Sequence, residues 1–169
     1  MTTPSPVSQK KPAPLSPDEA YSAARQSWAS SLVIAGIGLV LIMGILLKRD
    51  GWAWAAGAAG EPINDSSSMV GGLMVGVAVA WLALLGPIVL VLRSYCFFRL
   101  PEERGGRPVE PGSYLKGMAS VWGVLTVGAM LALIGAAIEG QVMPGGLVAL
   151  VAVMVLGMVQ PNKRALGLS

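Results

Sequence analysis

Four long apolar runs, separated by short polar segments, dominate the pattern of the chain. Residues 30–47, 69–92, 117–138 and 142–160 contain no charged side chain. An α-helix needs about 20 apolar residues to cross about 30 Å of hydrocarbon, and each run is close to that length. The fourth run reaches it only if Val142 to Gly146 belong to the run. The pattern predicts an all-α integral membrane protein with four transmembrane helices.

The polar segments before the first run predict a tail and a short helix. Residues 1–16 are rich in Pro, Ser and Lys. Such a segment buries too little apolar surface to offset its ordering entropy, so we expect a disordered cytoplasmic tail. Ser16 suits a helix N-cap and Pro17 suits the first helical position. Residues 17–29 then predict a short amphipathic helix at the membrane interface, with one face formed by Ala20, Tyr21, Ala24 and Trp28.

Two further features complete the predicted layout. Gly86-Pro87 lies inside the second run. Proline removes a helical hydrogen bond and its ring collides with the preceding turn, so we expect a kink there. Residues 30–160 form a four-helix transmembrane domain in this interpretation. Residues 161–169 form a short cytoplasmic tail.

The distribution of Lys and Arg predicts the orientation of the helices. Of the twelve Lys and Arg residues, only Lys48 and Arg49 lie in the first and third loops. The others lie in the N-terminal part, in the loop after the second run, or in the C-terminal tail. Positive loops stay on the cytoplasmic side, so both termini are predicted to be cytoplasmic. Since no segment resembles an organelle-targeting sequence, we expect a bacterial plasma (inner) membrane.

Composition agrees with a membrane protein and limits the chemistry that the chain can perform. Charged residues make up 12% of the chain, against about 25% in a soluble domain. The chain has no histidine and one cysteine, which excludes the commonest general base and any internal disulfide. We therefore expect no enzyme activity, no metal site and no cofactor. The basic residues flank apolar runs and form no stripe with aromatic side chains, so we do not expect nucleic acid as a partner.

Small residues recur at helical spacing in the second and third runs. Gly72, Gly76 and Ala80 form a G-x-x-x-G pattern that is extended by one turn. Small residues let transmembrane helices approach closely and gain dispersion contacts. The pattern fits either packing inside the chain, which we favour, or an interface with a second copy or a partner helix. A matching row in the third run, able to receive the second run, consists of Gly128, Ala132 and Ala136.

Glu139 is the acidic residue nearest to an apolar run. A carboxylate inside a membrane is costly and is by default a functional candidate, often a proton or sodium site. Residues 136–156 are similar to the ion-binding helix of rotary-ATPase proteolipid ring subunits, which carry an acid mid-helix before a run of small and apolar residues. That resemblance implies an ion site at Glu139. Its position departs from the pattern, because residues 117–138 precede it and place it at the outer end of the run. We favour a carboxylate in an interfacial loop.

Aromatic and basic residues near the ends of the runs are candidate anchors at the membrane–water interface. They are Trp28, Trp52, Trp54, Arg93 and Arg99. Trp81 differs from them because it lies near the centre of the second run. Its indole N–H needs a hydrogen-bond partner, so we expect Trp81 to face another helix.

Short loops, small-residue faces and apolar runs without charge favour a non-catalytic role. We expect a small accessory, structural or assembly subunit of a larger membrane complex. Its partners would be membrane lipids and either other membrane subunits or further copies of itself. The alternative is a homo-oligomeric channel or small transporter, which needs a polar pathway assembled from several copies. Glu139 and Thr126 are the polar candidates for such a pathway.

Overall fold

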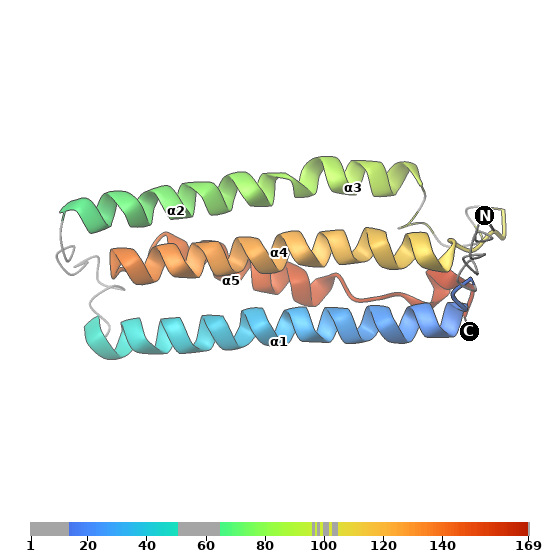
Figure 1. Ribbon diagram of the computed structural model, residues 1–169, viewed down its shortest axis with the longest axis horizontal. Coiled ribbons are helices and arrows are strands. Elements are labelled where there is room, and N and C mark those ends of the chain that lie inside the picture. Colours follow the sequence, from blue (N-terminus) through green and yellow to red (C-terminus); the bar gives the residue numbers. More distant parts are fainter. Residues whose placement is uncertain are drawn as a thin grey trace, which may run out of the picture.

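The computed structural model describes residues 14–50, 65–95, 97, 99, 102 and 105–168 of the chain. Every secondary-structure element in this part of the chain is a helix (Figure 1). In chain order the elements are α1 (Pro17–Asp50), α2 (Asp65–Ala83), α3 (Leu85–Ser94), α4 (Pro111–Glu139), α5 (Gly145–Met158) and the 3-10 helix η3 (Lys163–Leu166). The described residues are therefore all-α, as the apolar pattern predicts.

Three helical stretches are long and apolar enough to cross a membrane: Pro17–Lys48, Met69–Ser94 and Pro111–Glu139. They contain 32, 26 and 29 residues respectively. At 1.5 Å per residue, even the shortest measures about 39 Å, more than the ~30 Å of hydrocarbon in a bilayer. These helices indicate an integral membrane protein.

The helix formed by the fourth apolar run, α5, is shorter than the sequence predicts. We expected a helix over residues 142–160, but α5 has 14 residues and ends at Met158. It measures about 21 Å, less than the thickness of the hydrocarbon. The prediction is wrong at both ends, because residues 142–144 form a turn and residues 159–160 lie beyond the helix. Pro144 has no amide N–H to give to a helix interior, and it stands at the N-cap of α5, where none is needed.

A capping box starts α1. The Glu19 N–H donates to the Ser16 hydroxyl oxygen at 3.3 Å, and the Ser16 N–H donates to the Glu19 carboxylate at 3.0 Å. The predicted N-cap at Ser16 is thus confirmed. From there α1 continues without interruption to Asp50, so the predicted segments 17–29 and 30–47 are parts of one helix.

The second transmembrane stretch is interrupted at Leu84, between α2 and α3. The ring of Pro87 collides with the carbonyl four residues earlier, which belongs to Ala83, the last residue of α2. The backbone forms a 3-10-type turn at this point, because the Leu84 N–H donates to the carbonyl of Trp81, three residues earlier, at 3.1 Å. The sequence predicts a kink at Gly86-Pro87, and the helix is interrupted just before it, at Leu84.

The centre of the bundle is α4, which contacts α1, α2, α3 and α5. In Figure 1 it lies between α1 on one side and the α2–α3 arm on the other. In the most apolar 18 residues of α4, 56% are buried, whereas the corresponding fractions are 11% for α1 and 17% for Met69–Ser94. Much of the surface of α1, α2 and α3 is therefore left for lipid or for other proteins.

Two tryptophan side chains donate hydrogen bonds to carbonyl groups at the C-terminal end of α5. The helix ends at Met158, and its last carbonyl groups have no partner inside the helix. The Trp28 indole N–H donates to the Leu156 carbonyl at 2.9 Å, and the Trp122 indole N–H donates to the Val159 carbonyl at the same distance. Because these donors belong to α1 and α4, the C-terminal end of α5 is held between those two helices.

Beyond α5 the chain runs to the end of the bundle where α1 and α4 begin, and η3 lies there (Figure 1). The Asn162 N–H donates to the Tyr114 hydroxyl at 2.8 Å. The Val109 N–H, just before α4, donates to the Ala165 carbonyl at 3.0 Å. The C-terminal segment is thereby tied to the start of α4. We call this the basal end of the bundle.

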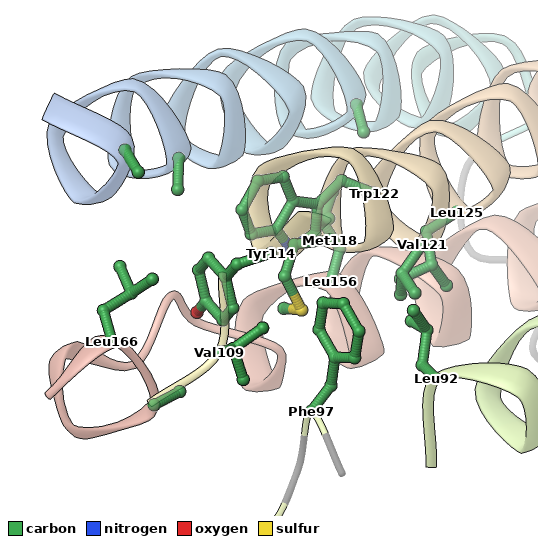
Figure 2. Close-up of a cluster of buried hydrophobic side chains, with 14 of the residues drawn as sticks. Leu92, Phe97, Val109, Tyr114, Met118, Val121, Trp122, Leu125, Leu156 and Leu166 are labelled. Carbon is green, nitrogen blue, oxygen red and sulfur yellow. The ribbon is translucent and has the colours of Figure 1, made fainter. Parts of the chain in front are cut away.

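A cluster of buried side chains fills the basal end (Figure 2). Trp122, Tyr114 and Leu156 are among its largest fully buried members. The Tyr114 ring stacks on that of Phe97, with centroids 6.2 Å apart and planes 11° apart. The loop after α3, the start of α4 and the end of α5 therefore share one core.

The indole of Trp122 should contribute to stability chiefly through its hydrogen bond. Trp122→Phe keeps an aromatic ring in the core but leaves the Val159 carbonyl without its donor. We expect the free energy of unfolding in detergent to fall by about 1–3 kcal/mol, the usual cost of an unsatisfied buried polar group.

The matched control is Trp81→Phe, because Trp81 is 38% exposed and its indole has no acceptor among the described residues. This substitution should leave the unfolding free energy nearly unchanged. An equal loss in both variants would show that ring size, and not the hydrogen bond, stabilises the end of α5.

Candidate functional site

One face of α2 packs on α4 through two glycines that meet backbone to backbone. A Cβ added to Gly71 would lie 2.9 Å from the Gly135 carbonyl oxygen and 2.6 Å from the Glu139 Cβ. A Cβ added to Gly135 would lie 3.0 Å from the Gly71 carbonyl oxygen. Neither position has room for a side chain, so the two helices approach as closely as small residues permit.

The small residues of α2 that the sequence predicts as a packing or partner interface lie on the outside of the bundle. Gly72, Gly76 and Ala80 are exposed, and a Cβ built at either glycine would meet no described atom within 4 Å. Ala83 is exposed as well, and its spacing continues the same row along the helix. We call these four residues the outer small face. The packing inside the chain that we favoured for this pattern is made instead by the neighbouring residue Gly71.

The matching row in α4 is buried and receives two helices. Gly128 admits Leu82 of α2, whose Cδ2 would lie 2.5 Å from an added Cβ. Ala132 and Ala136 admit the start of α5: a Cβ at Gly145 would lie 2.6 Å from the Ala132 carbonyl oxygen and 3.0 Å from the Ala136 Cβ. This row therefore holds both α2 and α5 in place.

Sequence reasoning missed Gly71 and Gly135 as the closest contact. Hydrophobic periodicity identifies the buried face of a soluble helix, but α2 is apolar all round and offers no such signal. Two weaker signals are present. Gly71 and Gly72 are adjacent, so either face of α2 could pack closely, and Gly128 and Gly135 are one heptad apart on one side of α4.

Glu139 is the last residue of α4, at the end of the helix opposite to the basal end. One of its carboxylate oxygens is buried and has no hydrogen-bond partner among the described residues. Gly140 follows with a left-handed φ of 72° and ends the helix. The carboxylate thus lies at the end of the apolar stretch and not at its middle.

Thr126 is the second polar side chain with a buried, unpartnered atom, its hydroxyl oxygen. It lies about 20 Å along the helix axis from Glu139, at 1.5 Å per residue. The two groups therefore form no common site within one copy of the chain.

The predicted interface anchors occupy different environments. Trp28 is half-buried and bonded to α5, so it acts inside the protein. Arg93, in the last turn of α3, and Arg99 are exposed. Trp52 and Trp54 lie outside the described residues. Trp81, which the sequence predicts to face another helix, is 38% exposed.

The described residues contain no group of three or more His, Cys, Asp or Glu side chains that could hold a metal ion. The features that remain as candidates are the outer small face, the carboxylate of Glu139 and the exposed cations at the basal end. Comparison with family models, with curated proteins and with solved structures gives no match.

The two adjacent glycines of α2 should respond differently to the same substitution. Gly71→Ala places a methyl group against the Gly135 carbonyl and the Glu139 side chain, which forces α2 away from α4. We expect a loss of about 1–3 kcal/mol in the free energy of unfolding in detergent, as for other overpacked contacts.

Gly72→Ala is the control, because its methyl group meets no described atom within 4 Å. It should leave the stability of the isolated chain unchanged or raise it slightly through better helix propensity. A larger loss for Gly72→Ala than for Gly71→Ala would mean that the two faces of α2 are exchanged.

Proposed function

We propose that the protein is a small non-catalytic, multi-pass membrane protein that serves as an accessory, structural or assembly subunit of a larger membrane complex. The observation that carries this proposal is the exposed row of small residues on α2, Gly72, Gly76, Ala80 and Ala83. It lies within Met69–Ser94, a stretch long and apolar enough to cross a membrane.

The physical basis is the way helices associate in lipid. Lipid tails are as apolar as the helices, so association depends on dispersion contacts and on close backbone approach. The contact of Gly71 with Gly135 is one example of such approach within the chain. The outer small face offers the same backbone exposure to a helix of a partner, and no described helix of this chain uses it.

We further propose four membrane crossings with both termini in the cytoplasm of a bacterial plasma membrane. The position of η3 supports an even number of crossings, since the hydrogen bond from Val109 to Ala165 ties the C-terminal segment to the start of α4. In this proposal the short helix α5 and the extended residues after it make the fourth crossing together. The concentration of Lys and Arg outside the first and third loops supports a cytoplasmic basal end.

A homo-oligomeric channel or small transporter is the second candidate. The observation in its favour is the unpartnered carboxylate oxygen of Glu139, because an uncompensated acid near hydrocarbon is commonly functional. A pathway through several copies would have to connect Glu139 with Thr126, which lie far apart along α4.

The composition of the native particle tests the first proposal. The protein is extracted at its native expression level in mild detergent, and the intact particle is weighed and its components identified by mass spectrometry. We expect other polypeptides in fixed stoichiometry. Gly72→Leu and Gly76→Leu should release them or lower their recovery by about tenfold or more, which corresponds to roughly 1.4 kcal/mol of association free energy.

Gly44→Leu is the matched control, because Gly44 is also exposed in an apolar helix and has no described atom near its added Cβ. It should leave the particle intact. A particle of this chain alone would contradict the accessory role. Ion flux from that particle after reconstitution, lost on Glu139→Gln or Thr126→Val, would establish the channel.

The proposed orientation predicts the result of reporter fusions. A fluorescent protein that folds only in the cytoplasm should fluoresce when fused after Leu168 and should be dark when fused after Lys48. Alkaline phosphatase, which is active only outside the cytoplasm, should give the opposite result at both positions. Fluorescence at both positions, or activity of the phosphatase at both, would contradict the proposed crossings.

A further inference from the structure

A polar hollow lies on the exposed side of α1, near the basal end of the bundle. It has a volume of about 490 Å³ and is lined by Tyr21, Ser22, Arg25, Gln26 and Ala29. The volume is within the usual range of ligand sites, which is about 300–1,000 Å³. All the lining side chains except that of Ala29 carry a polar group, and that of Arg25 is a cation. The lining therefore suits a polar ligand with a negative charge.

A second cation reaches the hollow from the C-terminal segment. The Lys163 ammonium of η3 lies over the Tyr21 ring, 5.4 Å from the ring centroid. This cation–π contact places the charge beside a lining residue. Lys163 and Arg25 are both exposed, and neither forms an ion pair within the described part of the chain. Two positive charges from different elements therefore meet at the hollow.

The nearest acids of α1 do not occupy the hollow. The Glu19 carboxylate accepts hydrogen bonds from the Ser16 N–H at 3.0 Å and from the Ser16 hydroxyl at 2.8 Å. Asp18 precedes Arg25 by nearly two turns, about 10 Å along the helix axis. Neither acid lines the hollow. Both cations are thus left to interact with an anion from outside.

The hollow lies at the depth where the uncharged part of the bundle begins. Residues 26–47 of α1 and 117–138 of α4 are uncharged, 22 residues in each helix. Such a stretch measures about 33 Å, close to the ~30 Å of hydrocarbon in a bilayer. The two helices begin at the same end of the bundle (Figure 1), and a Cβ added to Gly38 would lie 3.0 Å from the Met130 Sδ. Thirteen residues earlier on each helix stand Arg25 and Gly117, so Arg25 lies at the level of lipid headgroups.

We propose that the hollow binds the phosphate of an anionic phospholipid in the leaflet at the basal end. The Arg25 guanidinium binds two phosphate oxygens, since its planar fork of N–H groups matches such a pair. The Lys163 ammonium supplies the second positive charge, and the Gln26 amide supplies a further donor. The two cations select an anionic headgroup, because basic residues at the membrane surface attract such lipids. The proposal rests on insertion in a membrane and not on association with other subunits.

The same face of α1 continues into the hydrocarbon as an apolar surface. Val33, Gly36 and Val40 follow Ala29 at helical spacing. Val33 is 55% exposed and Val40 is 71% exposed, and a Cβ built at Gly36 would meet no described atom within 4 Å. An acyl chain that descends from the hollow therefore meets exposed apolar residues along this face.

The test measures lipid retained by the purified chain. The protein is exchanged into nanodiscs of equal parts phosphatidylglycerol and phosphatidylcholine with identical acyl chains, then released and weighed by native mass spectrometry. We expect one tightly held phosphatidylglycerol per chain. Arg25→Gln combined with Lys163→Gln should lower its retention about tenfold or more, since each cation near an anionic membrane surface contributes about fivefold to binding. Equal retention of both lipids by the unmodified chain would overturn the proposal.

The control variant combines Arg93→Gln with Lys116→Gln. These exposed cations belong to α3 and α4 and do not line the hollow, and the change in net charge is the same. The control should retain phosphatidylglycerol as the unmodified chain does. Equal losses in the two double variants would mean diffuse attraction to a positive surface and would contradict a defined site.

A second pair of variants leaves both cations and the contact of Lys163 with Tyr21 in place. Ser22→Glu adds a carboxylate to the hollow at an exposed lining position, so it should lower retention of phosphatidylglycerol about tenfold without disturbing the fold. Ser94→Glu adds the same charge at an exposed position of α3 outside the lining and should leave retention unchanged. Unchanged retention in Ser22→Glu would contradict an anion in the hollow.

A soluble competitor separates a lipid site from a site for free phosphate esters. Glycerol phosphate carries the phosphate of the headgroup but no acyl chain. It should not displace phosphatidylglycerol from the chain in detergent, because it gains nothing from the apolar face below Ala29. Displacement at millimolar concentration would show that the hollow takes soluble phosphate esters and would overturn the assignment to a lipid.

Because the isolated chain is used, a failure here is distinct from a failure of the proposed accessory role. Loss of phosphatidylglycerol selectivity would leave the composition of the native particle unaffected. Conversely, a native particle that contains only this chain would leave the lipid measurement unaffected.

Discussion

Backbone hydrogen bonding in a medium without water is the constraint on which the rest of this structure depends. Lipid offers no donors or acceptors, so non-helical backbone is tolerated only where the protein itself satisfies it. The chain leaves the helical path at Met158 and still has to reach η3. The indoles of Trp28 and Trp122 bond to carbonyls at this point. Since these donors come from α1 and α4, the short helix α5 helps to position the two longest helices.

Close packing in the interior explains why so much of the exterior is left unused. The buried rows of α4 hold α2 and α5 through glycine and alanine, which brings helices together without long side chains. Such a compact core needs only one side of α1 and one side of α2. Their other sides, the outer small face among them, are therefore free to evolve as surfaces for lipid or for neighbouring proteins.

Features that depend on local chemistry could be predicted from the sequence. The apolar runs, the cap at Ser16 and the helix interruption before Pro87 each follow from residues within one or two turns. The end of α5 was predicted only to within two residues: the apolar run continues to Gln160, whereas the helix ends at Met158, where indoles from distant helices bond to the carbonyl groups. The choice between Gly71 and Gly72 as the packed glycine was also hidden. It depends on the rotation of α2 about its axis, which a uniformly apolar helix does not encode.

The bonds of Trp28 and Trp122 also impose an order on biogenesis. The ribosome makes α1 first, α4 much later and α5 last, so both indoles enter the membrane before their acceptors exist. The final segment is too short to span the hydrocarbon as a helix. It therefore docks onto helices that are already in place. A nascent chain released before that step would carry two unpaired indole donors and an unfilled seam along α4, a surface that membrane proteases and chaperones can recognise as immature.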